Sequence, residues 1–171
     1  MKPLLVMGLR TLAHLDAKET MYEQIDRDEI QASGRFPVEH LEVIAGGFAL
    51  GILSSHSIPR IERVIGHLGW TRLFPTEHLI SSDPLDRKDA ANWEGWRREY
   101  EARGLALHTV VDIGEVLVRN LAGSSVFVDV DKYYVIGDAG IRIEGATRIT
   151  ALDQTRAYRQ AVRGPRNRTG R

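Results

Sequence analysis

Short apolar runs alternate with amphipathic segments along most of the chain. The clearest unit is Phe48–Gly69, where an apolar run ends at Ser54 and apolar residues then recur every three or four positions. This pattern predicts a buried strand, a polar turn and an amphipathic helix. Pro59 fits the first turn of that helix, where its missing N–H group costs nothing, and the Ser57 side chain can cap the same turn.

The same kind of pattern recurs along the chain and predicts the fold class. Because predicted strands alternate with predicted helices, we expect an α/β protein with a doubly wound parallel sheet and right-handed crossovers. The predicted strands lie at residues 3–9, 48–53, 78–81 and 105–111, and the predicted helices at residues 38–45, 58–68, 86–102 and 154–162.

Two segments depart from this alternation. Residues 10–36 are rich in charged side chains and predict a small insertion or cap after the first strand. Residues 126–143 hold two apolar runs separated by a Gly-Asp-Ala-Gly turn signal, which predicts an antiparallel hairpin on the sheet edge near the C-terminal end. We therefore expect one domain over residues 1–162, followed by a basic, disordered tail over residues 163–171.

Composition narrows the possible classes of site. The chain contains no cysteine, which excludes disulfides, thiolate catalysis and cysteine-ligated zinc and is compatible with a cytoplasmic location. Its 23 basic and 23 acidic side chains give zero net charge, so the protein as a whole does not attract nucleic acid. No apolar run approaches the ~20 residues that a membrane helix needs, so we expect no membrane partner.

The predicted sheet locates a candidate site. In open parallel sheets ligands bind beyond the carboxyl ends of the strands, so Ser54, Ser55 and His56 lie where a site is expected. His14 and Asp16 follow the first strand closely, and together with His56 they could hold a metal or act as acid and base. The sequence has no glycine-rich phosphate loop.

The order of these motifs resembles the haloacid dehalogenase-like (HAD) superfamily, in particular its small phosphatase-like members. Residues 51–70, GILSSHSIPRIERVIGHLGW, look like the second motif of that superfamily, whose Ser or Thr binds the transferring phosphoryl group; Ser54 holds that place. Lys88 sits where the third motif's lysine steadies the developing charge. Asp112, at the end of HTVVD, matches the first acid of the fourth motif, which holds Mg²⁺. The resemblance implies a HAD-like, Rossmannoid sheet.

This chain departs from the superfamily most clearly at the superfamily's first motif. That motif is Asp-x-Asp-x-Thr, in which the first Asp is the nucleophile and the second the general acid and base; those places fall on Gly8 and Arg10. The second acid of the fourth motif falls on Ile113. Glycine offers no nucleophile, and an arginine stays protonated. Arginine also replaces attraction for Mg²⁺ by repulsion; one contact between two unit charges at ~4 Å is worth about 4 kcal/mol at an effective dielectric of 20.

These departures leave three interpretations open. The chain is a HAD relative that binds a phosphorylated ligand, a small molecule or a nucleic-acid end, with weak or lost phosphatase activity; or an active phosphohydrolase with carboxylates from elsewhere; or a generic Rossmann-like domain. In the first, Ser54, Ser55, Arg10 and Lys88 bind the phosphate, with Asp112 and Lys88 as the remaining catalytic groups and Asp112 as the one metal ligand. A metal-free phosphate site fits the same residues.

Two further groups of residues offer alternatives. Asp129 and Asp131 form the only Asp-x-Asp after an apolar run, so they could replace the missing first motif; they could equally line the solvent face of an edge hairpin. In a non-catalytic interaction protein, the arginine-rich tail or the tryptophan-bearing helix at residues 86–102 would bind a protein or nucleic-acid partner.

Overall fold

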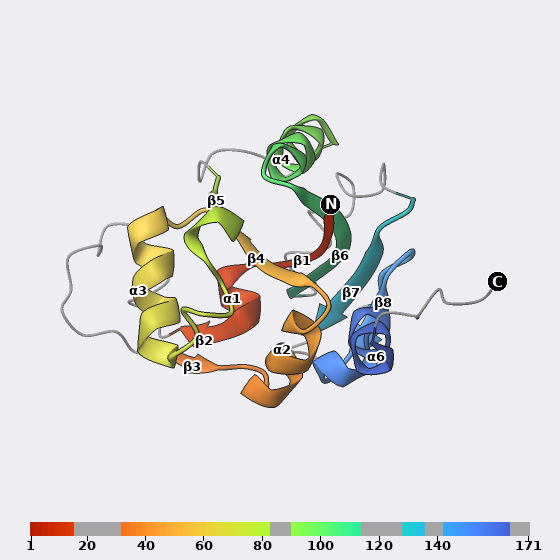
Figure 1. Ribbon diagram of the computed structural model, residues 1–171, viewed down its shortest axis with the longest axis horizontal. Helices are drawn as coiled ribbons and strands as arrows, with labels where there is room; N and C mark the ends of the chain where they lie inside the picture. The colour runs from red at the N-terminus through yellow and green to blue at the C-terminus, as the bar shows by residue number, and fades with distance from the viewer. Residues whose placement is uncertain (16–31, 83–89, 114–127, 136–141, 165–171) are drawn as a thin grey trace.

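The computed structural model describes residues 1–15, 32–82, 90–113, 128–135 and 142–164. These residues form a six-stranded sheet in which every pairing is parallel, in the order β5-β4-β1-β6-β7-β8 (Figure 1). The strands are β1 (Lys2–Met7), β4 (Ala49–Ser54), β5 (Leu79–Ser81), β6 (Leu105–Ile113), β7 (Asp131–Val135) and β8 (Thr147–Ile149). The predicted doubly wound α/β architecture is confirmed as a Rossmann-like sheet.

The strand order fixes where a ligand would bind. From β1 the chain moves outward through β4 to β5, and it then returns to the other side of β1 to form β6 and β7. The order therefore reverses between β1 and β6. In open α/β sheets, the crevice beyond the carboxyl ends of the strands at such a reversal is the usual ligand site.

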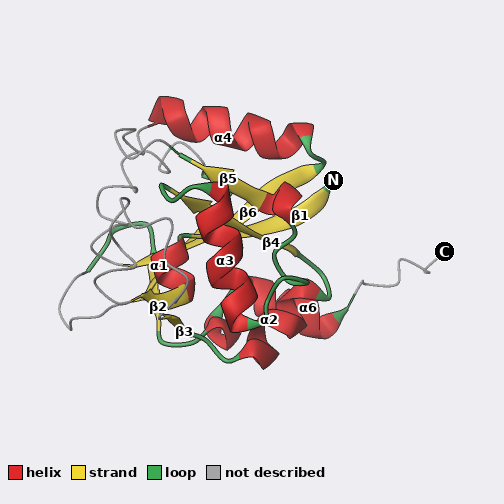
Figure 2. Cartoon of the chain, turned by 90° about the vertical axis from the view of Figure 1, so that its left-hand side faces the viewer, coloured by secondary structure: helices red, strands yellow, loops and turns green. Residues whose placement is uncertain are grey.

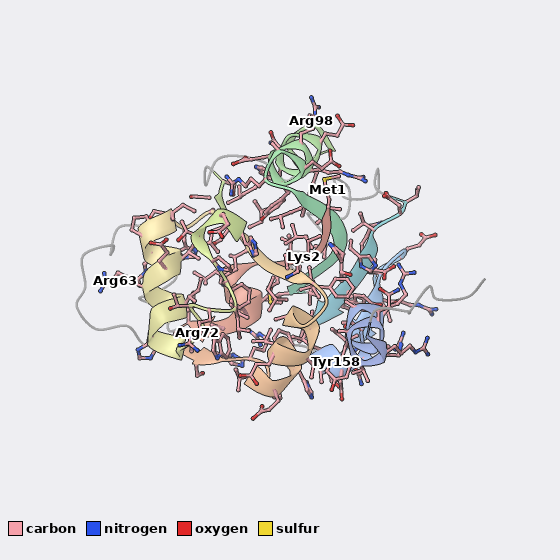
Figure 3. The ribbon with its side chains drawn as sticks, viewed as in Figure 1. Met1, Lys2, Arg63, Arg72, Arg98 and Tyr158 are labelled. Carbon is pink, nitrogen blue, oxygen red and sulfur yellow. The ribbon has the colours of Figure 1, made fainter. Side chains whose placement is uncertain are left out.

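Helices cover both faces of the sheet. Helix α4 (Ala90–Ala102) lies on one face, and α2 (Val38–Ala45), α3 (Ile58–Leu68) and α6 (Arg156–Arg163) lie on the other (Figure 2). Strand β1 serves both layers because its side chains alternate: Leu4 and Val6 join the core under α4, and Leu5 and Met7 join the opposite core. Tyr158 of α6 points toward α2 and packs edge-on against His40 (Figure 3).

The local signals of the first unit are confirmed. The Ser57 side chain accepts a hydrogen bond from the Arg60 backbone N–H at the start of α3, and Pro59 lies in its first turn. The helix ends at Gly69, whose φ of 75° is readily adopted by glycine. Helix α2 ends as expected before Gly46, and short 3-10 turns at Thr76–His78 and Leu152–Gln154 precede β5 and α6.

The predicted insertion at residues 10–36 includes a small antiparallel ribbon. After β1 the chain makes one helical turn, α1 (Leu9–Leu12), and enters β2 (Ala13–Leu15), which pairs with β3 (Ala32–Gly34). The ribbon is held against the end of α3 by a close contact between Gly34 and Trp70, because a Cβ at position 34 would lie 2.4 Å from the Trp70 ring. This contact fixes β3 and the residue that follows it, Arg35.

The antiparallel hairpin predicted at residues 126–143 is wrong for the residues that the structure describes. Strand β7 pairs in parallel with β6, and β8 pairs in parallel with β7. Arg142 and Ile143, predicted as a strand, lie outside any strand. An apolar run specifies burial but not strand direction; the Gly-Asp-Ala-Gly turn signal itself lies outside the described residues.

The aromatic face of the tryptophan-bearing helix is buried and does not form a free binding surface. Trp93, Trp96 and Tyr100 are 1%, 8% and 0% exposed because they pack onto the sheet, and the Tyr100 hydroxyl donates to the Ile52 carbonyl at 3.2 Å. Arg98 points away from the sheet (Figure 3). The aromatic side chains of α4 are therefore core residues. In the described part of the chain, no helix has the length and apolar character needed to cross a membrane.

We predict opposite effects for alanine at two glycines. Gly34→Ala should lower the free energy of unfolding by about 1–3 kcal/mol, because the buried Trp70 ring must move. Gly66→Ala, in α3 with no atom within 4 Å of the new Cβ, should raise it by about 0.5–1 kcal/mol. Urea unfolding of both variants checks this, and a stable Gly34→Ala variant would contradict the packing of the ribbon on Trp70.

Candidate functional site

Three residues of the resemblance meet at the carboxyl edge of the sheet. Gly8 follows β1, Ser54 ends β4 and Asp112 lies near the end of β6. A Cβ at Gly8 would lie 3.5 Å from Asp112 Oδ1 and 3.9 Å from the Leu53 carbonyl oxygen, so the ends of the three strands surround this position. The ends of β1, β4 and β6 therefore lie close together at this edge.

The buried Asp112 side chain is held by two hydrogen bonds. The residue is 4% exposed, and its Oδ1 accepts hydrogen bonds from the Thr11 hydroxyl at 2.9 Å and from the Ile113 backbone N–H at 2.8 Å. Thr11 belongs to α1, so this contact ties the segment after β1 to the end of β6. A buried carboxylate needs such donors, because an unsatisfied one carries a large desolvation cost.

Ser54 and His56 form a second hydrogen-bonded pair. Ser54 Oγ lies 2.9 Å from His56 Nδ1 and also accepts from the His56 backbone N–H at 3.2 Å. Burial and the nearby Arg10 both lower the pKa of His56, which favours the neutral ring. The turn is closed from β5 by the Ser81 hydroxyl, which donates to the His56 carbonyl at 2.6 Å.

Whether His56 carries a proton on Nδ1 decides whether the Ser54 hydroxyl donates to the ring or accepts from it. When a neutral ring carries its proton on Nε2, its Nδ1 accepts a hydrogen bond from the Ser54 hydroxyl. A ring that carries a proton on Nδ1 donates to Ser54 Oγ instead, and the hydroxyl proton is then available to another acceptor. The pair can therefore present Ser54 as a donor to an anion when Nδ1 is protonated.

Arg10 and Arg35 supply positive charge at the same edge. Arg10 is exposed on α1, and Arg35 reaches back from the end of β3 to donate to the carbonyls of Thr11 and Arg10, both at 3.1 Å. Burial and the charge of Arg10 lower the pKa of Arg35. Sequence reasoning missed Arg35, and the only signal for it was a lone arginine at the end of the charged insertion.

The remaining predicted site residues are placed as follows. Ser55 is half-buried in the bend after Ser54, and Ile113 is half-buried at the end of β6. His14 lies on β2 and is exposed. Lys88 and Asp16 lie outside the described residues, as do residues 165–171 of the tail.

Among the described residues, the donors at this edge do not form a set that suits Mg²⁺. Within the described ranges, no three His, Cys, Asp or Glu side chains gather in a group that could hold a metal. Asp112 is the one carboxylate of the predicted motifs, and the places of its expected partners are taken by Gly8, Arg10 and Ile113. Mg²⁺ requires oxygen ligands in octahedral geometry, and an arginine at the position of a carboxylate repels it.

Asp129 and Asp131 do not replace the first motif. They precede or begin β7, so they lie at the amino end of that strand, away from Gly8 and Ser54. Asp129 pairs with Arg97 of α4 at 2.9 Å, and Asp131 pairs with Arg156 of α6 at 2.7 Å. The hydrogen bond from Arg97 lowers the pKa of Asp129. Both acids therefore serve ion pairs between the sheet region and its helices.

Comparison with known proteins adds evidence on the fold. No protein-family model matches the sequence, and no curated protein matches it. The structure is similar to the crystal structure of an uncharacterized protein from Listeria monocytogenes serotype 4b, with a TM-score of 0.59 and 14% sequence identity over 90% of this chain and 94% of that chain. At this identity the likeness shows the fold alone, and it extends over nearly the whole of both chains.

We predict that the Thr11–Asp112 hydrogen bond stabilises the fold. Thr11→Val removes the donor from a buried carboxylate and should lower the free energy of unfolding by about 1–3 kcal/mol in urea denaturation. Thr11→Ser keeps the hydroxyl and should retain most of the stability. A loss in Thr11→Ser with no loss in Thr11→Val, which keeps the methyl group, would show that the methyl group of Thr11, rather than its hydrogen bond, stabilises the fold.

We also predict that Arg10 controls the ionisation of His56. NMR titration should give His56 a pKa below its ordinary 6.5, and Arg10→Ala should raise it, because one of the two causes of the shift is removed. His56 binds a proton less well in the folded state than in the unfolded state. The contribution of neutral His56 to the free energy of unfolding is therefore fully present above pH 6.5 and is lost as the pH falls below it. Arg98→Ala, on the outer side of α4, should leave the pKa unchanged; an unchanged value in Arg10→Ala would contradict the coupling.

Proposed function

We propose that this protein is a HAD-like relative that binds a phosphorylated ligand at the carboxyl edge of β1, β4 and β6 and has weak or no phosphatase activity. The observation that carries the proposal is the meeting of Gly8, Ser54 and Asp112 at the point where the strand order reverses. These positions match the nucleophile, phosphate-binding and acidic positions of the superfamily, and the nucleophile is the one that is absent.

The chemistry of the edge supports phosphate binding. Arg10 supplies a permanent positive charge, Ser54 a hydroxyl and the turn after β4 backbone N–H groups, all of which suit phosphate oxygens. By the resemblance, Lys88 is a further ligand. The ligand is a phosphorylated small molecule or the phosphorylated end of a nucleic acid.

The same edge argues against phosphoryl transfer in the manner of the superfamily. Gly8 has no side chain to attack phosphorus, and Arg10 cannot remove a proton from water. Asp112 Oδ1 is engaged by Thr11 and by the Ile113 N–H, and the donor set does not suit Mg²⁺. We therefore propose that the anion is bound directly by protein groups, without a divalent cation.

The test is thermal unfolding with inorganic phosphate, and separately with tungstate, in the presence of EDTA. An anion at ten times its Kd should add about 1.4 kcal/mol and raise the Tm by about 3–6 °C. Ser54→Ala and Arg10→Ala should each reduce the rise strongly, because each removes a ligand. Arg98→Ala removes an equally charged side chain from the outer face of α4 and should retain the full rise.

Two results would contradict the proposal. A rise in Tm that survives in both Ser54→Ala and Arg10→Ala would place the anion elsewhere. Mg²⁺-dependent hydrolysis of a generic phosphate ester that falls strongly in Asp112→Asn would show an active phosphohydrolase, with Asp112 in its mechanism.

A further inference from the structure

Arg35 is held in place by the turn that follows β1. Its backbone N–H donates to the Leu12 carbonyl at 2.9 Å, while its Nε and Nη2 donate to the carbonyls of Thr11 and Arg10. The close contact of Gly34 with Trp70 fixes the preceding residue. The guanidinium is thus positioned by several independent contacts beside the candidate site.

Within the part of the chain that the structure describes, the Arg35 guanidinium retains donors for a ligand. Two of its five N–H groups account for the contacts to Thr11 and Arg10. Neither Arg35 nor Arg10 forms an ion pair with an acidic side chain among the residues that the structure describes. Other arginines of the same protein do: Arg97 pairs with Asp129 and Arg156 with Asp131.

The positive charges of Arg10 and Arg35 act on neighbouring basic groups along this edge. The charge of Arg10 lowers the pKa of both His56 and Arg35, and the charge of Arg35 lowers the pKa of His14 on β2. The three couplings have the same sign, and burial contributes to each. Arg10 and Arg35, which are joined by the hydrogen bond from the Arg35 guanidinium to the Arg10 carbonyl, thus act on the same neighbourhood, and a bound anion would offset their two charges.

We propose that Arg35 and Arg10 form a two-arginine clamp for the terminal phosphate of a monoester dianion, so that the site selects phosphate monoesters over diesters. This inference rests on the proposed function, and it names the class of ligand and adds a binding residue. A terminal phosphate carries three non-bridging oxygens and nearly two negative charges, which suit two guanidinium groups and the Ser54 hydroxyl. A diester carries one charge and two such oxygens, so it cannot use both arginines equally well.

A purely structural role for Arg35 is the competing explanation. An arginine at the end of a helical turn can stabilise it by donating to its last carbonyls. That role requires the contacts to Thr11 and Arg10 but no ligand. The two explanations differ in what happens to ligand affinity and to the neighbouring histidines, and a test must therefore measure both.

The experiment compares phenyl phosphate with diphenyl phosphate by calorimetric titration of the full chain at pH 8 in EDTA. The wild-type protein should prefer the monoester by at least about tenfold, the effect of one charge-assisted hydrogen bond. Arg35→Gln removes the charge and keeps an N–H donor for the α1 carbonyls; it should weaken monoester binding about tenfold or more while diester binding changes little. Arg35→Lys keeps the charge, so its affinity for phenyl phosphate should lie between those of the wild type and Arg35→Gln. The affinities of Arg98→Ala should match those of the wild type.

NMR titration of the histidines provides a second readout that a structural role would not move. Phenyl phosphate should raise the pKa of His14 and His56 in the wild type, because the bound dianion offsets the two arginines, and the effect on His14 should be lost in Arg35→Gln. Arg35→Gln that is folded and binds the monoester as the wild type does would overturn the clamp but leave the proposed function standing. A wild-type protein that binds neither ester would overturn both.

Discussion

The hydrogen bond from Thr11 to Asp112 joins the two sides of the sheet at the point where the strand order reverses. It connects the turn after β1 with the end of β6, and both partners are almost fully buried. A carboxylate at this depth must be satisfied, and Thr11 together with the Ile113 N–H provides the donors. Because the Asp112 carboxylate accepts these two hydrogen bonds, it holds the ends of β1 and β6 together more directly than it offers ligands to a cation.

The chemistry of the edge then depends on its basic groups. The chain has no net charge, yet Arg10 and Arg35 lie at one end of the sheet without an acidic ion-pair partner among the described residues, and their charge lowers the pKa of the neighbouring His14 and His56. The ribbon of β2 and β3 makes this possible, because it returns the chain to α1 and delivers Arg35 to the carbonyls of that turn. In a site of the usual HAD kind a divalent cation would balance the charge of the phosphate; here we propose that guanidinium groups do so.

The residue pattern was sufficient for the local elements of the fold. The run ending at Ser54, the cap at Ser57 and the proline at position 59 define β4 and α3 by short-range physics, and each element was predicted close to its observed bounds. The alternation of strands and helices likewise gave the parallel sheet. Strand direction at the C-terminal end was not encoded locally, so the segment that forms β7 was predicted as part of a hairpin, and β8 was not predicted.

The candidate site was predictable only where its residues end strands. Gly8, Ser54 and Asp112 share an edge because parallel strands share a direction, which the sequence pattern predicts. Arg35 could not be found in this way, because its place depends on the pairing of β2 with β3 and on the contact of Gly34 with Trp70. Asp129 and Asp131 have suitable spacing for a pair of catalytic acids, but they lie at the opposite end of their strand and pair with separate arginines.

The most direct test of a metal-free anion site is a crystal structure of the protein soaked with tungstate in the presence of Mg²⁺, with the tungsten located by its anomalous scattering. The account predicts one tungstate that contacts the guanidinium groups of Arg10 and Arg35 and the hydroxyl of Ser54, with no cation between it and Asp112. A tungstate bridged to Asp112 by Mg²⁺, or one bound away from these residues, would contradict it.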